Sequence, residues 1–231
     1  MKGYRKRDLL SGIMLLTAFA VWTVLLRYID VQKAGPKGTE IGFATFNVWF
    51  HRLTGEHMLI YTITDWLGLV PIVICICFGG LGFAQLVKRR SLLRVDPDLL
   101  LLGVYYVLVI LGYLLFEMVP INYRPILIGG RQEASYPSST TLLVLSVMPT
   151  LKFQTDRRSA NPMFKKSISI FVVVFSAFMV VGRLISGVHW ATDIIGSVFL
   201  SSGLFMIYRF LAEYSDSKRP NHHVEASDGV Q

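Results

Sequence analysis

Long apolar stretches alternate with short polar segments along almost the whole chain. A helix needs about 20 mainly apolar residues to cross the hydrocarbon core of a bilayer. Stretches that approach this length cover residues 9–28, 66–87, 99–118, 139–155, 167–183 and 190–211. The fourth opens with hydroxyl side chains and the fifth is short, so these two carry the weakest signal. The pattern predicts an all-α, polytopic membrane bundle of about six transmembrane helices.

The polar segments differ in how many basic residues they hold. The larger share of the lysines and arginines falls at the N-terminus, after the second stretch, after the fourth stretch and around the end of the sixth. Basic loops stay in the cytoplasm. We therefore expect a multi-pass plasma-membrane protein with both termini cytoplasmic. The first stretch is long for a signal peptide and no small-residue cleavage site follows it, so we interpret it as a retained helix.

With this orientation, residues 29–65 lie outside. Within them, the segment Ile41–Leu53 mixes apolar and polar side chains, a pattern typical of a short helix that lies on the membrane surface. A lid or a substrate-access element is the alternative interpretation. Residues 1–214 are expected to form one transmembrane domain, and residues 215–231 a disordered cytoplasmic tail, because the tail is almost entirely polar.

Composition narrows the function classes. The chain is 53% hydrophobic and 16% charged, with a formal net charge of +8. This basic balance fits orienting loops, so we expect no nucleic-acid partner. Cys75 and Cys77 both lie within an apolar stretch, which predicts neither a disulfide framework nor a metal site. The absence of disulfides and of a signal favours a bacterial plasma membrane. We expect no cofactor, and the oligomeric state stays open.

Candidate chemistry is concentrated in three short segments. They are Glu117–Pro125, Tyr136–Thr141 and Gly182–Asp193. In the expected topology, all three lie at the outer ends of helices, at one level of the membrane. Ionisable residues at such a depth are costly and usually face a cavity or a partner. We therefore expect these segments to line a common pocket.

The third segment has the most specific spacing. His189 and Asp193 are four residues apart, so on a helix they would share a face. A carboxylate that accepts one ring N–H of a histidine fixes its tautomer, and the other nitrogen can then act as a base or nucleophile. Arg124 and Arg183 could hold a tetrahedral anion, and Ser138 and Ser139 begin a helix, where unpaired N–H groups favour phosphate.

These residues resemble the motifs of the type 2 phosphatidic acid phosphatase superfamily, which also includes the vanadium haloperoxidases. The family motifs are Lys, six residues, Arg-Pro; then Pro-Ser-Gly-His; then Ser-Arg, five residues, His, three residues, Asp. The spacing here matches over residues 117–193. The resemblance implies that His189 is the nucleophile, that Asp193 orients it, and that Arg124, Arg183, Ser138, Ser139 and Thr140 surround the phosphate. Glu117, Tyr123 and Arg131 are possible site-lining residues.

This chain departs from the family motifs at three positions. Glu117 stands where the first motif has lysine. Ser139 and Thr140 replace the Gly-His of the second motif, so the usual acid for the leaving group is absent. Gly182 replaces the serine of the third. His51 and His57 lie outside in the expected topology and are candidates to replace the missing acid, although loop histidines are usually solvated.

The leading interpretation is a membrane hydrolase that acts at the outer face on a lipid phosphate or a polyprenyl pyrophosphate, with a histidine nucleophile and no metal. The alternative is a catalytically impaired, phosphatase-like protein that binds a lipid phosphate head group or acts as a scaffold. A transporter or flippase has less support, because no predicted span carries a charge at mid-depth.

Overall fold

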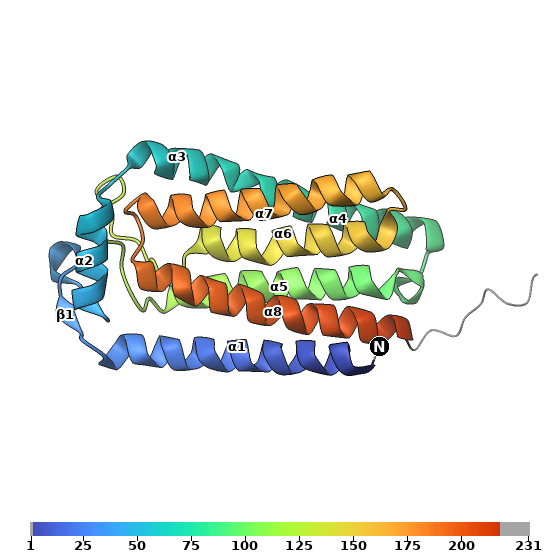
Figure 1. Cartoon of the computed structure of the whole chain (residues 1–231), viewed down its shortest axis with the longest axis horizontal. Coiled ribbons are helices and arrows are strands. Elements are labelled where there is room, and N and C mark those ends of the chain that lie inside the picture. Colours follow the sequence, from blue (N-terminus) through green and yellow to red (C-terminus); the bar gives the residue numbers. More distant parts are fainter. Residues whose placement is uncertain (1, 218–231) are drawn as a thin grey trace, which may run out of the picture.

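The structure is a computed structural model that describes residues 2–217, with side chains from Lys6 onward. Long helices lie side by side in a bundle, and a short two-stranded hairpin sits at one end (Figure 1). The long helices are α1 (Lys2–Tyr28), α4 (Leu69–Arg89), α5 (Pro97–Met118), α6 (Ser139–Arg158), α7 (Pro162–Ile185) and α8 (Ala191–Ser217). The all-α membrane bundle expected from the sequence is confirmed.

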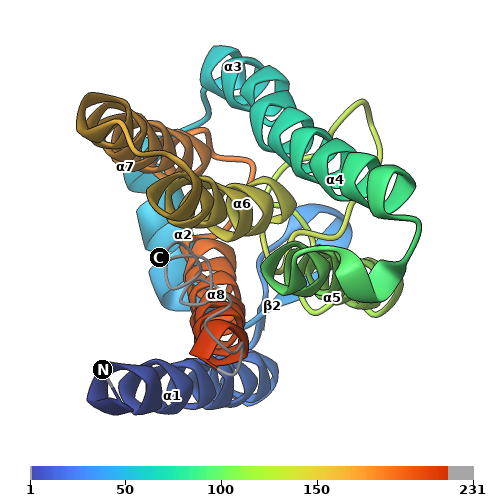
Figure 2. The same ribbon diagram turned by 90° about the vertical axis from the view of Figure 1, so that its right-hand side faces the viewer.

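Five helical segments of the described chain are long and apolar enough to cross a membrane. They are Lys6–Tyr28, Met58–Arg89, Pro97–Met118, Pro162–Ile185 and Ala191–Ser217. Helix α6 is not among them, although its 20 residues match the hydrocarbon thickness at 1.5 Å per residue. The reason is its position: α6 packs against α4, α5, α7 and α8, near the middle of the bundle (Figure 2).

Neighbouring helices satisfy several polar groups of α6, although the buried Ser146 hydroxyl has no partner among the described residues. Tyr106 pairs with Thr150 through their hydroxyls at 2.7 Å, and the Tyr105 hydroxyl donates to the Ser146 carbonyl at 2.9 Å. Buried polar groups in a membrane protein need such internal partners. Helix α6 therefore faces protein rather than lipid, which explains why the fourth apolar stretch gave a weak signal.

Helices α1 and α8 make the closest long contact of the bundle. A Cβ at Gly203 would meet Leu16 at 2.9 Å, and a Cβ at Gly12 would meet Ile207 at 2.7 Å, so the absence of side chains lets the two helices approach. Arg209 Nε also donates to Asp8 Oδ2 at 2.7 Å. This pairing places the start of α1 beside the end of α8, at the end of the bundle opposite the hairpin (Figure 1).

The second predicted span begins earlier than expected. Helix α3 (Met58–Leu67) continues into α4 with only Gly68 between them, and the Gly68 N–H bonds to the carbonyls of Thr64 and Asp65. Residues 58–65 are therefore helical, and the candidate span covers Met58–Arg89 rather than beginning at residue 66. The polar residues Thr62, Thr64 and Asp65 interrupted the apolar pattern without interrupting the helix.

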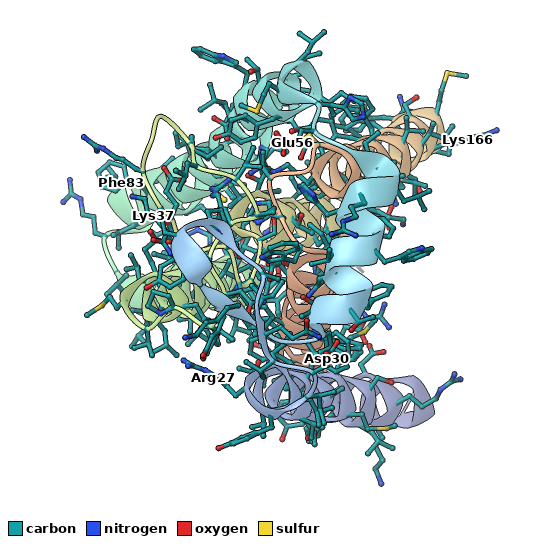
Figure 3. The ribbon with its side chains drawn as sticks, turned by 90° about the vertical axis from the view of Figure 1, so that its left-hand side faces the viewer. Arg27, Asp30, Lys37, Glu56, Phe83 and Lys166 are labelled. Atoms are coloured by element: carbon teal, nitrogen blue, oxygen red, sulfur yellow. The ribbon has the colours of Figure 1, made fainter. Side chains whose placement is uncertain are left out.

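One end of the bundle, called here the α2 end, is covered by irregular structure (Figure 3). It carries β1 (Gln32–Lys33), η1 (Pro36–Gly38), β2 (Glu40–Ile41), α2 (Ala44–Thr54) and the loop 119–138. Helix α2 confirms the short helix expected near Ile41–Leu53, and it leaves Trp49 and Leu53 exposed. Its buried Asn47 donates to Thr192 Oγ1 at 2.9 Å, which fixes α2 to the start of α8.

The opposite end carries η2 (Leu92–Arg94) between α4 and α5. Helix α8 extends through Ser217, so residues 215–217 are helical and not part of a tail. The remainder of the expected disordered tail, residues 218–231, lies outside the described residues.

Candidate functional site

The loop between α7 and α8, residues 186–190, presents His189 to the interior of the α2 end. Gly187 in this loop has φ +75°, and a Cβ there would lie 2.4 Å from the Gly55 carbonyl oxygen, so the turn requires glycine. His51 Nε2 lies 3.0 Å from the Gly187 carbonyl oxygen and supports the turn from α2. The His189 residue is only 3% exposed.

The hydrogen bonds of His189 define its tautomer. Its Nδ1 lies 3.1 Å from the backbone carbonyl oxygen of Ser135. A carbonyl only accepts, so Nδ1 carries the proton and donates it. Arginine only donates, and Arg183 Nη2 lies 3.2 Å from Nε2. The unprotonated Nε2 of a neutral ring therefore faces the guanidinium group.

The charge state of His189 follows from its surroundings. Burial lowers the pKa of His189 well below 6.5, and the positive charges of Arg183 and Arg124 lower it further, against the Ser135 hydrogen bond that raises it. The ring is therefore neutral at neutral pH, with Nε2 available as a base or nucleophile.

Asp193 is fully buried in the first turn of α8. Its Oδ2 accepts the backbone N–H of Trp190 at 2.9 Å, and its Oδ1 accepts Asn122 Nδ2 at 3.1 Å. The distance from Oδ2 to His189 Nδ1 is 3.8 Å, longer than a hydrogen bond. His189 precedes α8, so the expectation that both side chains share a helical face was wrong. Asp193 holds the backbone beside His189.

The two arginines converge on this histidine with unused donors. The Arg183 side chain is 1% exposed, lies 4.9 Å over the Tyr61 ring and is 3.7 Å from Asp65 Oδ1. Arg124 comes from the loop 119–138, and its Nε lies 3.1 Å from Glu133 Oε2. Among the described residues, Nη1 of each arginine has no hydrogen-bond partner. Buried donors without partners are costly, so these N–H groups are ready for an anion.

A polar cavity of about 250 Å³ adjoins Arg124 and His189, whereas Arg183 is not among its lining residues and contacts it through His189. Arg124 and His189 lie on its wall, together with Ser139 at the first turn of α6. The remaining lining residues come from α5 and the loop: Tyr113, Phe116, Glu117, Glu133, Ala134, Ser135, Tyr136 and Pro137. The three segments expected to share a pocket are thus together at the α2 end.

Several expected site residues lie elsewhere. Ser138 is fully buried, and its hydroxyl donates to Thr141 Oγ1 at 3.1 Å rather than lining the cavity. Thr140 lines a neighbouring groove. Arg131 is exposed at a turn where it bridges Ile128, and neither it nor Tyr123 lines the cavity. Helix geometry explains the positions of Ser138 and Thr140, because successive residues at the start of α6 project in different directions.

The sequence did not predict some residues near the site, and it offered others only as candidates. The Ser135 carbonyl and the Asn122 amide hold His189 and Asp193, and both belong to the loop 119–138. The Ser135 carbonyl is part of the backbone and lies 54 residues before His189, so no side-chain pattern in the sequence could predict this contact. His51 and His57, considered as substitute acids, do not line the cavity. His51 supports the loop, and His57 Nε2 bonds to the Thr54 carbonyl.

An apolar groove of about 270 Å³ adjoins the polar cavity. It shares Tyr113 and Ser139 with the cavity and continues along α4, α5 and α6 past Leu69, Ile72 and Ile110. Thr140 lines this groove beside Asp65 and Gly68. The polar and apolar spaces meet at Tyr113 and Ser139, so a ligand that occupies both would be amphiphilic.

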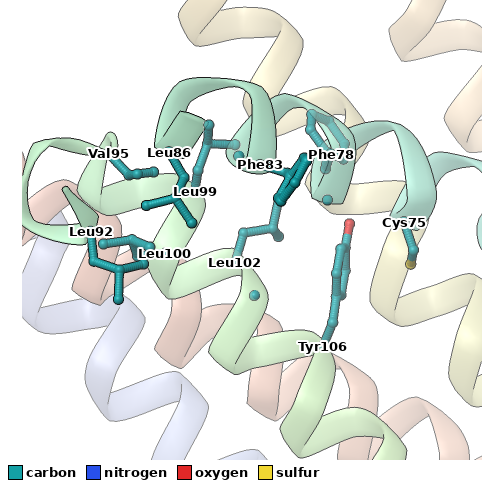
Figure 4. Close-up of a pocket in the computed structure, with 13 residues that line it drawn as sticks. Cys75, Phe78, Phe83, Leu86, Leu92, Val95, Leu99, Leu100, Leu102 and Tyr106 are labelled. Carbon is teal, nitrogen blue, oxygen red and sulfur yellow. The ribbon is translucent and has the colours of Figure 1, made fainter. Parts of the chain in front are cut away.

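A further pocket, of about 230 Å³, lies between α4 and α5 toward the opposite end of the bundle. Apolar side chains such as Phe78, Leu99 and Leu102 line it, with Cys75 and Tyr106 at one side (Figure 4). No charged residue lines it. The pocket therefore offers no charged side chain that could bind a phosphate.

Comparison with known proteins gives concordant results. The family model described as PAP2 superfamily matches residues 100–217, a range that includes Arg124, Arg183 and His189. No curated protein matches this chain. Among solved structures, the chain is similar to the crystal structure of the first transmembrane PAP2 type phosphatidylglycerolphosphate phosphatase from Bacillus subtilis, with a TM-score of 0.64 and 16% sequence identity. The alignment covers 92% of this chain and 98% of that chain.

Proposed function

Because this chain belongs to the PAP2 superfamily, we propose that it is a membrane phosphohydrolase that acts on a lipid phosphate or lipid pyrophosphate. One observation carries the proposal. The unprotonated Nε2 of His189 faces a buried guanidinium group whose other nitrogens lack hydrogen-bond partners within the described part of the chain, beside a polar cavity.

The proposed reaction uses His189 as the nucleophile. Nε2 attacks phosphorus, the N–P bond forms, and the P–O bond to the lipid breaks, so that the leaving oxygen departs with the bonding electrons and takes a proton from water. Water then attacks the phosphohistidine, which releases inorganic phosphate and restores the neutral ring. Before the attack, Arg183 moves its Nη2 from the ring nitrogen to a phosphate oxygen. Arg124 supplies a second guanidinium to the developing charge.

The apolar groove supports a lipid rather than a soluble phosphate. It meets the polar cavity at Tyr113 and Ser139, and Ile72 and Ile110 continue its wall along membrane-spanning helices. A head group in the cavity would leave its hydrocarbon chain in the groove. The bond to be cleaved would then lie where the two spaces meet.

A second candidate function is head-group binding with little turnover. Thr140 stands where the family motif has the acid histidine, and it lines the groove. Glu117 stands where the first motif has lysine. Glu133 already pairs with Arg124. A phosphate at Nη1 of Arg124 would lie beside this carboxylate, which repels it. These features favour a slow enzyme or a binding protein built on the same fold.

We further propose that the site faces the outside of a plasma membrane and that both termini are cytoplasmic. Lys88, Arg89 and Arg90 gather at the end of α4, and Lys165 and Lys166 at the start of α7, both opposite the α2 end. Basic residues of this kind favour the cytoplasmic side.

The test is phosphate release by the purified protein from a panel of lipid phosphates and lipid pyrophosphates. We expect His189→Ala to lower release to background. The matched control is His57→Ala, which removes an exposed histidine at the same end of the bundle. Activity that survives His189→Ala would refute the nucleophile. Absence of release from every substrate, with vanadate binding that depends on Arg183, would favour the binding protein.

A further inference from the structure

The cavity that holds Arg124 and His189 also holds two carboxylates. Glu117 comes from the last turn of α5, and Glu133 comes from the loop 119–138. Glu133 is paired with Arg124 at 3.1 Å. Glu117 makes no ion pair among the described residues, and its side chain is hydrogen-bonded to Tyr113. The cavity lining thus carries two carboxylates and one guanidinium group, and Arg183, beyond His189, supplies a second positive charge. This arrangement does not favour a dianion alone.

Aromatic rings form the wall beside these carboxylates. Tyr113 lies on α5 one turn before Glu117, Phe116 directly precedes Glu117, and Tyr136 comes from the end of the loop. The Phe116 and Tyr136 rings pack edge to face, with centroids 5.5 Å apart. The Tyr136 hydroxyl pairs with Thr23 Oγ1 at 2.7 Å, so its polar tip is engaged with α1 while the residue lines the cavity. Aromatic faces together with carboxylates favour organic ammonium groups.

The arginines supply the other half of the site. Arg183 is 1% exposed and the Arg124 side chain is 10% exposed, and Nη1 of each lacks a hydrogen-bond partner among the described residues. A phosphate that binds Nη1 of Arg124 would lie beside the Glu133 carboxylate, which pairs with Nε of the same arginine. Two anions side by side repel each other, and a positive charge on the ligand would relieve this repulsion.

We propose that the cavity recognises a phosphate head group that also carries an ammonium group. The phosphate lies against Arg124, Arg183 and His189, and the ammonium lies against Glu117, Glu133 and the aromatic wall. This inference rests on the proposed function only in placing the phosphate at the arginines. It adds the substrate class, a zwitterionic phosphorylated lipid, and it assigns Glu117 to head-group selection.

The test compares two soluble probes that differ in one atom. Phosphocholine carries a quaternary ammonium, and 3,3-dimethylbutyl phosphate has carbon in place of that nitrogen. Their affinities for the detergent-solubilised full chain are measured from the ligand-dependent rise in its unfolding temperature. We expect phosphocholine to bind about threefold to fivefold more tightly, because Glu117 and Tyr113 are exposed and cation–π contacts are weaker at exposed sites than at desolvated ones.

Variants test whether a preference for phosphocholine depends on the carboxylates of the cavity. Glu117→Gln should remove most of the preference, and Glu117→Gln combined with Glu133→Gln should remove all of it. Glu40→Gln, which changes an exposed carboxylate at the same end of the bundle, should leave it unchanged. Unfolding temperatures without ligand identify any variant that fails to fold, and in that case Glu117→Asp, which should retain part of the preference, replaces it.

The outcomes separate this inference from the proposed function. Equal binding of both probes, abolished by Arg183→Gln, would overturn the ammonium site and leave the phosphate site in place. A preference that persists in the double glutamine variant would also overturn it, because the ammonium would then bind elsewhere. Binding of neither probe would overturn both proposals.

Discussion

The ring of His189 is held by the backbone carbonyl of Ser135, at 3.1 Å from Nδ1, and not by a carboxylate. This contact joins the loop before α8 to the loop before α6. It fixes the tautomer with a group that cannot change its charge. Asp193 Oδ2 lies 3.8 Å from Nδ1, so it influences the ring through the backbone, by accepting the N–H of Trp190.

The first prediction follows from this division of roles. Asp193→Asn keeps the Ser135 contact, so the His189 tautomer should survive. The amide cannot accept from both Trp190 N–H and Asn122 through two oxygens, so one buried group loses its partner. We expect the free energy of unfolding to fall by about 1–3 kcal/mol. Activity of the folded fraction should fall far less than the ~10⁴-fold loss caused by a wrong tautomer in a catalytic triad.

Thermal unfolding and single-turnover assays of the same preparations measure the two effects. Ser201→Ala serves as a matched change of a buried polar residue later in α8, where its hydroxyl bonds only within its own helix. A loss of about 10⁴-fold with unchanged stability would show instead that the carboxylate acts directly on the ring.

The second prediction concerns pH. The positive charge of Arg124 helps burial and Arg183 to lower the pKa of His189. Arg124→Gln removes that charge, so the pKa of His189 should rise toward 6.5. Activity that requires the neutral ring is lost as pH falls through this pKa, so the acid limb of the pH profile should move to higher pH.

Histidine carbon-13 spectra of the solubilised protein, titrated with acid, measure this pKa, and the signal of His189 is assigned by its loss in His189→Asn. Arg131→Gln is the control, because Arg131 is an exposed arginine on the same loop that does not line the cavity. An unchanged or lower pKa in Arg124→Gln would contradict the electrostatic argument.

The third prediction concerns orientation. Arg131 lies at the α2 end and Lys166 lies near the start of α7, at the opposite end, and both are exposed. In a background with Cys75 and Cys77 changed to alanine, a single cysteine at 131 should react with an impermeant thiol reagent in intact cells. A cysteine at 166 should react only after the cells are opened. The reverse pattern would show that the site faces the cytoplasm.

The apolar signal was stronger for helices that expose apolar side chains than for the buried helix α6. Helix α5 exposes many apolar residues, and the stretch 99–118 matched its extent closely, whereas the stretch 167–183 began five residues after the start of α7. Helix α6 buries Ser146, Thr150 and Gln154 against its neighbours, and these residues weakened its signal. The pattern of one helix does not record which polar residues its neighbours will satisfy.

The candidate site was predictable in the same partial way. Motif spacing identified Arg124, Arg183 and His189, which the fold brings together. Spacing could not show that Ser138 is buried under Thr141 or that Thr140 faces the apolar groove, because side-chain directions at a helix start depend on the preceding loop. Glu133 reaches Arg124 across a turn of the loop, a contact set by tertiary structure.

The last prediction concerns the missing acid. Cleavage of a phosphate monoester expels an alkoxide, whose parent alcohol is about as weak an acid as water, and general acid catalysis is worth about 10²–10⁴-fold. Expulsion of phosphate from a pyrophosphate needs little protonation, because the leaving group has a pKa near ~6. We therefore expect the protein to turn over a pyrophosphorylated lipid faster than a phosphate monoester of the same chain.

The position of Thr140 shows where an acid would act. Thr140 lines the groove beside Ser139, where the groove meets the cavity, so an imidazole there would lie on the side from which the lipid oxygen departs. Thr140→His with Glu117→Lys should therefore raise turnover of the monoester by about 10²-fold or more and turnover of the pyrophosphate much less. Thr140→Asn with Glu117→Lys, which supplies the same charge change without an acid, is the matched control. Single-turnover rates on both substrates measure the effect. If the native protein turned over the monoester faster than the pyrophosphate, leaving-group protonation would not limit this site. Equal rate increases on both substrates in the double variant would lead to the same conclusion.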